Sequence, residues 1–530
     1  MKVLVADRLE KDGLRVLQKE RGLKVDVKLG LRPEELEEII PSYDAVIVRS
    51  GTRLTKEMIE AGKNLKVIGR AGVGVDNVDL ESATKRGVIV MNTPEGNTTA
   101  TAEHTMAMML ALARKVPQAY VSLTKGKWQR EEFMGTELQG KTLGIIGLGR
   151  IGREVARRAS QGFGMKVLSY DPFITEESVK PLGIIFCDFK KILKEADFLT
   201  VHTPLTPETK HLIDREAFAL MKRGVRIINC ARGGIVDEKA LLEAIRSGKV
   251  AGAALDVFEK EPPNRNPLLK RPEVIATPHL GAATHEAQEN VSVAVARQVI
   301  DALHNRAIRN AVNLPSLDPE TYRALRPWII LAERIGLIHT QLFGGRLREV
   351  TIRFGGEVTR YPLASLTLAV LKGLLAPILG NNTVNFVNAP SLARERGITV
   401  NESKTTEAKD FSNFIEIEAA HNHEKNRIMG TLFGNQDPRI VKINEFLLDA
   451  EPTGYMLFIT NEDRPGVVGT LGTILGRNNV NIAEMTLGRI KKKNKTMALT
   501  IINTDQDVPE KVLLEIKKLP PILDVKLVKL

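Results

Sequence analysis

The chain has 530 residues, 43% of them hydrophobic and 26% charged, which is the composition of a globular protein of about three or four domains. The formal net charge of +12 does not by itself indicate a nucleic-acid partner, because Lys and Arg are mostly interleaved with Glu and Asp. The sequence also excludes a disulfide framework and a helical membrane protein, since it has two cysteines and no apolar run of the ~20 residues that cross a bilayer.

The first part of the chain alternates short β patterns with helical patterns. The β patterns lie at residues 2–7, 24–29, 44–50, 65–72 and 88–94, and helical patterns lie at 33–40, 55–62 and 79–87. Such alternation predicts a parallel sheet with helices on both faces. A long and mostly apolar helical pattern follows from Thr98 to Lys125, and we expect it to break near Pro117.

A second series of αβ patterns begins at residue 142. Its β patterns lie at residues 142–149, 166–172, 198–205, 226–234, 251–258 and 273–280. Six strands are the count of a dinucleotide-binding sheet. A further helical pattern spans residues 285–305, and AVNLP at 311–315 is expected to be a linker.

The remaining chain lacks the βα alternation. Residues 316–450 mix helical and β patterns, and residues 451–454 are expected to form a second hinge. Residues 455–530 give the order βαββαβ of a ferredoxin-like domain, with the lysine-rich residues 491–495 at a hairpin turn. The predicted fold is therefore α/β, with two doubly wound Rossmann-like domains followed by an α+β domain and a ferredoxin-like domain. The predicted domains are residues 1–97 with 286–310, residues 98–285, residues 316–450 and residues 455–530.

A glycine-rich turn predicts a dinucleotide site at the start of the second series. Gly147, Gly149 and Gly152 form GxGxxG between a β pattern and a helical pattern. The first glycine permits the tight turn, the second lets the backbone approach a pyrophosphate, and the third lets the helix pack on the strand. Asp171 ends the next β pattern, 19 residues after Gly152. Its carboxylate would accept hydrogen bonds from both ribose hydroxyls and repel a 2′-phosphate, which favours NAD over NADP.

Three further loops follow strand ends, at residues 230–238, 256–262 and 277–283, and they should converge at the carboxyl edge of the sheet. They supply one arginine, one histidine and two candidate carboxylates: Arg232, His279, Glu259 and Glu261. Oxidation of a 2-hydroxy acid needs these residue types. A cation holds the substrate carboxylate, a base takes the hydroxyl proton while hydride leaves carbon, and a carboxylate orients the base.

On these motifs, residues 1–310 resemble the D-isomer-specific 2-hydroxyacid dehydrogenases. The stretches GLGRIG, NCARGGIVDE, DVFEKEP and TPHLGA are together highly specific. The resemblance implies that Arg232 is the substrate cation, that His279 is the general acid/base, and that Glu261, which directly precedes a proline, is its carboxylate partner. It also implies an NAD site formed by Val73, Gly147, Gly149, Arg150, Ile151, Gly152, Asp171, Thr203, Cys230, Ala231, Arg232, Asp256, His279, Gly281 and Ala282.

Two more arginines, Arg49 and Arg70, follow strands of the first series and could hold a phosphate. Within the family, the resemblance is closest to members that oxidise 3-phosphoglycerate to 3-phosphohydroxypyruvate, the first step of serine synthesis from that intermediate. It implies 3-phosphoglycerate as the substrate, with contacts from Arg49, Ser50, Gly51, Arg70 and Asn97. Trp128 and Arg130 also resemble these enzymes, and a cation from a partner subunit is plausible there.

Two other functions stay open on the sequence alone. A dehydrogenase for another D-2-hydroxy acid, such as glycerate or lactate, would not need both Arg49 and Arg70. An NAD-binding protein without catalysis would not need the complete Arg-Glu-His set. We expect no metal site, because His421 and His423 lie two residues apart without a cysteine or a third histidine nearby.

The last two predicted domains resemble regulatory modules of the same family. Residues 316–450 resemble the intervening domain of its long members, most clearly at 380–400. Arg439 and Lys442 are possible cations for a second anion there, and a structural spacer is an equal alternative. Residues 455–530 resemble an ACT domain, an amino-acid-binding module that commonly pairs edge to edge. The resemblance implies serine as an effector, with contacts at Asn461, Asp463 and Asn481.

Location and assembly follow from the same sequence. Two cysteines, Cys187 and Cys230, suggest a reduced cytoplasm. The N-terminus becomes charged after a short apolar stretch, so we expect no signal peptide. Because ACT modules pair, the expected assembly is a homodimer or a homotetramer.

Overall fold

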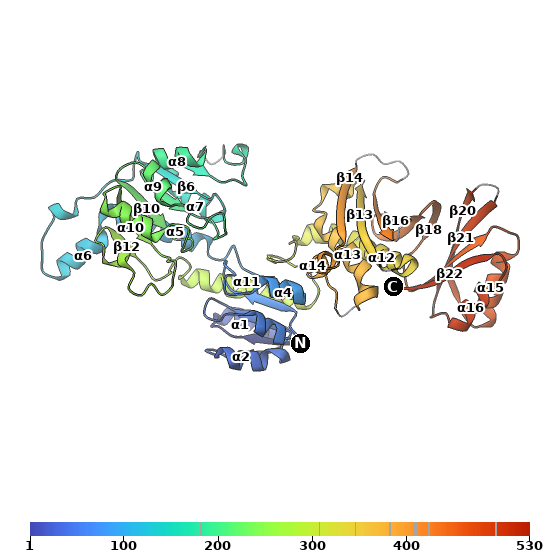
Figure 1. Cartoon of the computed structure of the whole chain (residues 1–530). Coiled ribbons are helices and arrows are strands. Elements are labelled where there is room, and N and C mark those ends of the chain that lie inside the picture. Colours follow the sequence, from blue (N-terminus) through green and yellow to red (C-terminus); the bar gives the residue numbers. More distant parts are fainter. Residues whose placement is uncertain are drawn as a thin grey trace.

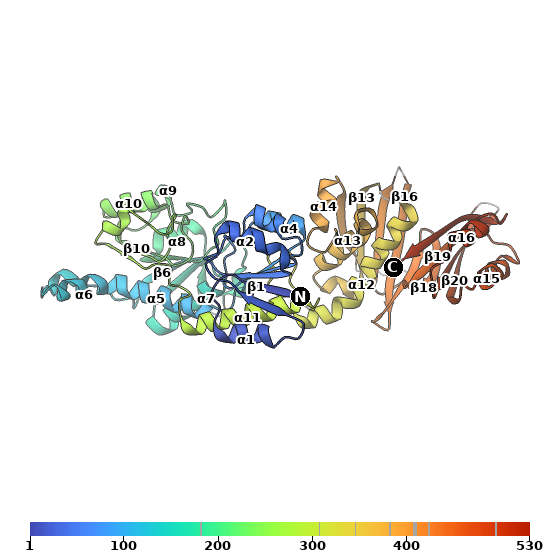
Figure 2. The ribbon, with the colours of Figure 1, turned by 90° about the horizontal axis from the view of Figure 1, so that it is seen from below.

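The computed structural model describes residues 1–180, 183–306, 308–344, 346–380, 383–405, 411–421, 424–492 and 495–530. Within these residues the chain forms four sheets, which lie one after another along an elongated molecule (Figures 1 and 2). The predicted fold class is confirmed. No helix of the described ranges is long and apolar enough to cross a membrane.

The first sheet is parallel, in the order β2-β1-β3-β4-β5. Its strands are β1 (Lys2–Val5), β2 (Lys24–Val27), β3 (Ala45–Val48), β4 (Val67–Arg70) and β5 (Ile89–Met91). Four helices follow its strands: α1 (Lys11–Lys19), α2 (Pro33–Ile39), α3 (Lys56–Ala61) and α4 (Leu80–Arg86). The late helix α11 (His285–Leu303) returns to this sheet, where Val295 and Val299 share a core with Val3 and Val5.

Helix α1 was absent from the predicted patterns, and its third residue, Gly13, is a poor helix former. The glycine is required by packing, since a Cβ at this position would lie 2.6 Å from the carbonyl oxygen of Ser292 in α11. The close approach of these two helices anchors α11 to the N-terminal sheet.

The second sheet is also parallel, in the order β12-β11-β10-β9-β6-β7-β8. Its strands are β6 (Thr142–Ile146), β7 (Lys166–Tyr170), β8 (Ile185–Phe186), β9 (Phe198–Val201), β10 (Val225–Asn229), β11 (Val250–Leu255) and β12 (Val274–Ala276). The six predicted strands are present, but the predicted count is wrong, because the two-residue strand β8 adds an edge too short to give a β pattern. The chain order reverses beside β6, which is where such sheets bind ligands.

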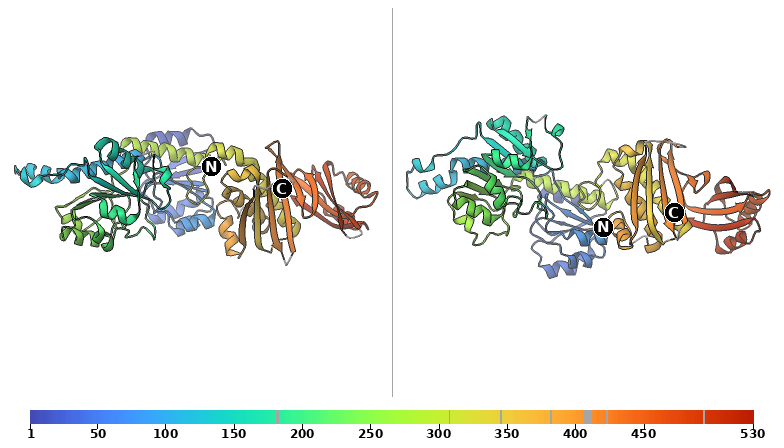
Figure 3. Two further views of the ribbon diagram at one scale, coloured as in Figure 1. Left: turned by 90° about the horizontal axis from the view of Figure 1, so that it is seen from above. Right: turned by 45° about the horizontal axis from the view of Figure 1, so that its top comes forward.

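The helices that flank the second sheet are α5 (Thr98–Arg114), α7 (Arg150–Arg157), α8 (Phe189–Glu195), α9 (Arg215–Leu220) and α10 (Glu238–Arg246), and α6 (Val116–Thr124) follows α5. The predicted break between α5 and α6 falls at Lys115, whose φ of 52° ends α5, and Pro117 lies in the first turn of α6. Helix α6 projects away from the sheet (Figures 1 and 3).

The third sheet has the order β14-β13-β15-β16-β17-β18. Its strands are β13 (Leu347–Gly355), β14 (Thr399–Thr405), β15 (Phe414–His421), β16 (Glu424–Phe433), β17 (Asp437–Ile443) and β18 (Phe446–Ala450). It packs against α12 (Pro319–Phe343), α13 (Ala364–Leu379) and α14 (Ala389–Glu395). Of the predicted features, His423 and Asn381–Asn382 of the 380–400 motif lie outside the described residues.

The fourth sheet has the order β20-β21-β19-β22 and the expected βαββαβ succession. Its elements are β19 (Tyr455–Glu462), α15 (Val467–Arg477), β20 (Ile482–Lys492), β21 (Lys495–Thr504), α16 (Glu510–Lys517) and β22 (Ile522–Lys529). The lysine-rich stretch joins β20 to β21 as predicted, although Lys493 and Asn494 lie outside the described residues.

Both predicted hinge segments make hydrogen bonds to neighbouring strands. At the first, Ala311 bridges to Met91, and the N–H of Val312 donates to the carbonyl of Val90 at 2.7 Å, so the expected linker extends the first sheet. At the second, the carbonyls of Glu451 and Thr453 accept Asn503 Nδ2. Met456 and Phe458 of the strand that follows belong to the hydrophobic core of the third sheet. The third and fourth sheets are therefore joined by a shared core.

Candidate active site

The loops after β11 and β12 bring a histidine and a carboxylate together. His279 Nδ1 lies 2.8 Å from Glu261 Oε2, and Glu261 Oε1 accepts the N–H of Phe258 at 3.1 Å. The other candidate, Glu259, lies 3.1 Å from His211 Nε2 instead. The geometry thus separates two carboxylates that the residues alone left equal.

The imidazole of His279 has half of its surface exposed. Within the described part of the chain, Nδ1 is engaged by Glu261 and Nε2 has no partner. A carboxylate accepts the Nδ1 proton, so this tautomer leaves Nε2 as a free base. The arrangement can take a proton from a hydroxyl group placed at Nε2.

The backbone of His279 has a φ of 56°, in the left-handed region that is uncommon for residues other than glycine. Asp256 holds the loop in this conformation. Its carbonyl accepts the N–H of His279 at 2.9 Å, and its carboxylate accepts those of Leu280 at 2.7 Å and Gly281 at 2.8 Å. Asp256 is 1% exposed, so its side chain supports the loop instead of presenting the carboxylate at the surface.

Three arginines, Arg49, Arg70 and Arg232, gather beside the loop that connects β4 to α4. Arg232, from the loop after β10, donates Nε to Asp76 at 3.3 Å. Burial and then the nearby charges of Arg232 and Arg49 together lower the pKa of Arg70 to about 10. Among the described residues, no carboxylate lies within ion-pair distance of Arg70, and its buried Nε has no partner. A partly buried guanidinium whose nearest acids, Asp76 and Asp7, lie beyond ion-pair distance favours an anionic ligand.

Two glycines make room for these arginines. A Cβ at Gly72 would lie 1.5 Å from Nη1 of Arg70, and a Cβ at Gly74 would lie 2.1 Å from Nη2 of Arg232. The loop that connects β4 to α4 therefore needs both glycines for the guanidinium groups to approach it.

The remaining predicted substrate residues lie in the loop after β3 and directly before α5. Asp7 accepts the N–H of Arg49 at 2.6 Å and fixes the loop that carries Ser50 and Gly51, both of which are exposed. Asn97 precedes α5, and its buried Oδ1 has no partner. Asp7 and Asp76 were not among the predicted site residues, because an acid beside a cluster of bases gives no sequence motif.

The glycine turn has the geometry that a pyrophosphate requires. Gly147 has a φ of 91°, and a Cβ there would lie 2.7 Å from the carbonyl oxygen of His202. A Cβ at Gly152 would lie 2.2 Å from the carbonyl oxygen of Gly147, whereas one at Gly149 would meet no atom within 4 Å. The open space at Gly149 adjoins the N-terminus of α7, where phosphate oxygens are favoured.

The other predicted cofactor residues lie around this turn. Asp171 follows β7, and its carboxylate accepts the N–H of Leu148 at 2.9 Å, which fixes it beside the turn with acceptor capacity left over. Thr203 has a buried Oγ1 without a partner. Arg150 pairs with Glu95 at 3.2 Å. The dinucleotide fits this set of donors and acceptors.

The remaining cofactor positions present mainly backbone groups. Burial raises the pKa of the Cys230 thiol to about 12, so Cys230 is not a nucleophile. Ala231 donates its N–H to Asn229 Oδ1 at 3.0 Å. The carbonyls of Val73 and Ala282 each accept a side-chain amide. Ile151 packs partly into the core under α7, and Gly281 is buried.

The three predicted effector contacts do not meet within one chain. Asn461 is 2% exposed and donates Nδ2 to the Glu462 carbonyl, and Asp463 pairs with Arg489 at 3.3 Å. Asn481 lies at the other end of the sheet, because it precedes the residue that pairs with Thr504, whereas Glu462 pairs with Met497. Helix α15 spans this separation, about 16 Å at 1.5 Å per residue.

Of the two possible cations for a second anion, Arg439 and Lys442, Arg439 is paired with carboxylates of the chain itself. Arg439 on β17 donates to Glu484 of β20 at 3.2 Å and lies 3.8 Å from Asp449. It thereby connects the third sheet to the fourth. Among the described residues, no group of three or more His, Cys, Asp or Glu side chains could hold a metal ion.

Comparison with known families divides the chain in the same order. Residues 106–281 match the NAD-binding domain of D-isomer-specific 2-hydroxyacid dehydrogenases, residues 324–444 match the D-3-phosphoglycerate dehydrogenase intervening domain, and residues 455–521 match the ACT domain.

Two relatives match this chain along its whole length. The chain is 46% identical to D-3-phosphoglycerate dehydrogenase of Archaeoglobus fulgidus over 100% of both chains. It is 43% identical to D-3-phosphoglycerate dehydrogenase of Bacillus subtilis over 100% of this chain and 99% of the relative. Among solved structures, D-lactate dehydrogenase from Aquifex aeolicus in complex with NAD and lactic acid is 31% identical, with a TM-score of 0.53. That match covers 59% of this chain and 100% of the other.

Proposed function

The chain belongs to the D-3-phosphoglycerate dehydrogenase family, and from this premise we propose how its residues carry out the reaction. The protein oxidises 3-phospho-D-glycerate to 3-phosphohydroxypyruvate with NAD, which is the first step of the phosphorylated route to L-serine. The reaction removes a hydride from C2 and a proton from the C2 hydroxyl group, and it leaves the carboxylate and the phosphate of the substrate unchanged.

The unpaired charge of Arg70 carries the assignment of the substrate. A simple 2-hydroxy acid has one carboxylate, which Arg232 can bind alone. Arg70 is a second, buried cation without a carboxylate partner among the described residues, and Arg49 adds a third. A substrate with both a carboxylate and a phosphate matches this charge, which favours 3-phosphoglycerate over glycerate or lactate.

The proton and the substrate carboxylate are handled by the three predicted catalytic residues. His279 Nε2 accepts the hydroxyl proton, and Glu261 stabilises the resulting imidazolium through the 2.8 Å contact at Nδ1. Arg232 binds the carboxylate and stabilises negative charge that develops on the C2 oxygen. Bound NAD supplies the hydride acceptor for this chemistry. The complete set argues against a protein that binds NAD without catalysis.

We assign the cofactor to the carboxyl ends of β6 and β7. The N–H groups at the start of α7 and the open space at Gly149 suit the pyrophosphate, and Asp171 suits the ribose hydroxyl groups. The first sheet with α11 then forms the substrate lobe, because it carries Arg49 and Arg70.

The test compares substrates and variants in one assay of NADH formation with the ketoacid product trapped. Wild-type protein should turn over 3-phosphoglycerate and prefer it to D-glycerate and D-lactate by at least ~100-fold in kcat/KM. His279→Ala should bind NAD normally and lose turnover, whereas Glu259→Gln should retain it. Equal use of D-glycerate, or full turnover by His279→Ala, would contradict the proposal.

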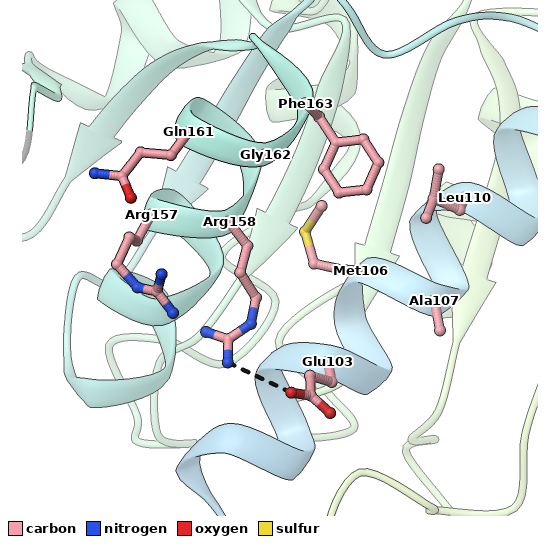
Figure 4. A pocket seen from close by; sticks show the side chains of 9 residues that line it. All are labelled: Glu103, Met106, Ala107, Leu110, Arg157, Arg158, Gln161, Gly162 and Phe163. Atoms are coloured by element: carbon pink, nitrogen blue, oxygen red, sulfur yellow. Dashed lines mark ion pairs between the residues drawn. The ribbon is translucent and has the colours of Figure 1, made fainter.

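We propose that a second copy of the chain completes the enzyme. Helix α6 and the loop after it project from the second sheet and expose a series of large apolar side chains: Val116, Tyr120, Val121, Leu123, Trp128 and Met134. Beside the base of this arm, α5 and residues 157–163 line an open hollow with Met106, Leu110 and Phe163 as apolar side chains and the pair Glu103–Arg158 beside them (Figure 4). An arm and a hollow of this kind suit reciprocal exchange between two copies.

The arm also carries Arg130, which would reach the partner's substrate in such a dimer. Arg232→Ala and Arg130→Ala proteins should each be impaired, and a refolded mixture should regain activity through sites that contain both arginines. Sedimentation of Tyr120→Glu protein as a smaller species would support the same interface. A fully active monomer would refute it.

We further propose that L-serine binds between two ACT domains. Asp463 of one copy can pair with the amine, and Asn481 of another can reach the same ligand, which resolves their separation within one chain. Asp463→Ala combined with Asn481→Ala should relieve inhibition by serine without lowering the uninhibited rate. Wild-type activity that is indifferent to millimolar serine would reject this effector.

The free thiols of Cys187 and Cys230 support activity in a reducing cytoplasm.

A further inference from the structure

One face of α5 contacts the loop that carries the catalytic base. Thr101 donates Oγ1 to the carbonyl of Gly281 at 3.1 Å, and His104 Nε2 lies 3.2 Å from Thr277 Oγ1. Thr277 Oγ1 in turn lies 3.9 Å from the sulfur of Met108. Positions 101, 104 and 108 share one side of a helix, and the other side of α5 lines the hollow of Figure 4.

His104 is the member of this face that contacts a buried charge. Its Nε2 lies 3.2 Å from Asp256 Oδ1, and the hydroxyl group of Thr277 donates to the same oxygen at 2.5 Å. An ionised carboxylate only accepts hydrogen bonds, so His104 donates here. Burial alone would raise the pKa of Asp256, but the donors His104 and Thr277 outweigh it and hold the pKa below its usual value.

Asp256 in turn accepts hydrogen bonds from the backbone of the loop that carries His279. The second carboxylate oxygen accepts the N–H of Gly281, Oδ1 accepts the N–H of Leu280, and the carbonyl accepts the N–H of His279 itself. The loop needs this bonding because the backbone of His279 is in the left-handed region. If the carboxylate lost a donor, it would reorient and release the two N–H groups next to the base.

We propose that His104 is a positioning residue for the reaction: it orients the Asp256 carboxylate and thereby fixes the loop that places His279 against the substrate hydroxyl group. His104 does not touch substrate in this scheme. It acts on the chemical step and leaves the binding of both substrates nearly unchanged. This inference rests on the proposed function.

Two conservative variants separate the donor from the bulk of the side chain. In His104→Gln, the amide nitrogen reaches the place of Nε2, whereas in His104→Asn the amide ends short of Asp256. We expect kcat to fall about 10- to 100-fold in His104→Asn, the cost of a base misplaced by about 1 Å, with both KM values within about twofold of wild type. His104→Gln should stay within about threefold of wild type. The isotope effect on kcat with C2-deuterated 3-phosphoglycerate should rise in His104→Asn, because hydride transfer becomes slower.

A matched control tests whether any histidine beside a carboxylate gives this result. His304 lies 3.2 Å from Glu20 at the far end of α11, about 28 Å along the helix from the catalytic loop. His304→Asn should leave kcat and the isotope effect unchanged. NAD affinity and the melting temperature, measured on every variant, identify any loss caused by unfolding.

The outcomes distinguish this inference from the proposed function. If wild type turns over and His279→Ala does not, a normal kcat in His104→Asn overturns the role of His104 alone. Equal losses in the Gln and Asn variants also overturn it, because the position of the donor would then be irrelevant. If wild type forms no NADH from 3-phosphoglycerate, the proposed function fails first and the role of His104 falls with it.

Discussion

Replacement of Arg70 by methionine should stabilise the ligand-free protein while weakening its activity. The folded protein lowers the pKa of Arg70 to about 10 from 12.5, chiefly by burial and then through Arg232 and Arg49. At 1.36 kcal/mol per pKa unit, this corresponds to about 3 kcal/mol of destabilisation of the charged form. The folded pKa lies below the unfolded value, so the destabilisation is fully present at every pH below about 10. Methionine keeps much of the side-chain volume without the charge.

The expected gain is about 1–3 kcal/mol in the free energy of unfolding, measured in urea at pH 7 without ligand. The same variant should lose about 10- to 100-fold in kcat/KM for 3-phosphoglycerate, because a charge-assisted hydrogen bond to phosphate contributes about 1.5–3 kcal/mol. Stabilisation by added 3-phosphoglycerate should shrink in parallel.

Arg226 provides a contrasting control. It is also partly buried, but it donates to Thr136 at 3.0 Å and lies 5.3 Å from the centre of the Phe198 ring. Burial lowers the pKa of Arg226 as well, but methionine would lose these two contacts, so Arg226→Met should gain less stability than Arg70→Met. If Arg70→Met gains no more than Arg226→Met, the arginine already has a counter-charge without the substrate, and the argument for a phosphate site fails.

Three further predictions concern other parts of the chain. Desolvation lowers the pKa of His202 to about 4 from 6.5, so the unfolded chain binds a proton at a higher pH than the folded protein does. As the pH falls from 6.5 to 4, the free energy of unfolding should therefore decrease by up to about 1.4 kcal/mol per pH unit. Urea titrations of wild type and His202→Asn test this, and parallel pH curves would contradict it. Iodoacetamide at pH 8 should label Cys187 and spare Cys230, whose thiol pKa is about 12. Detection of labelled Cys230 by mass spectrometry would contradict its burial. Arg489→Ala frees Asp463 from its ion pair and should lower the serine concentration for half inhibition about two- to fivefold in a rate assay, whereas an unchanged value would exclude Asp463 as the amine partner.

Local patterns carried most of the fold and the placement of the site. Buried parallel strands give continuous β patterns, and loops after such strands meet at one edge, so Arg232, Glu261 and His279 could be grouped before any coordinates. Strand β8 escaped detection because two residues give no period. Helix α1 was not predicted because its Gly13 is required by packing against Ser292, which lies 279 residues away and outside any local sequence pattern.

The supporting residues could not be found in the same way. The choice between Glu259 and Glu261 depends on which loop turns toward His279, and only family resemblance selected Glu261 in advance. His104 and Asp76 act through contacts between elements that are distant in sequence. The docked segment at Ala311 looked like a linker because its Asn and Pro residues are typical of loops, yet it pairs with β5.

The shared core of the third and fourth sheets has a consequence for removal of the ACT domain. Met456, Phe458 and Val528 of the ACT domain bury their side chains against the intervening domain, and Gln341 of α12 bonds the backbone of Lys529 in both directions. Deletion of residues 455–530 alone would leave an apolar sheet face bare to water and invite aggregation. The intervening domain and the ACT domain thus form a single cassette. Among the described residues, that cassette holds the substrate lobe through the bond from Asn385 to the carbonyl of Gly87, at the end of α4. An effector that tilts the cassette would pull on the helix that directly follows the loop beside Arg70.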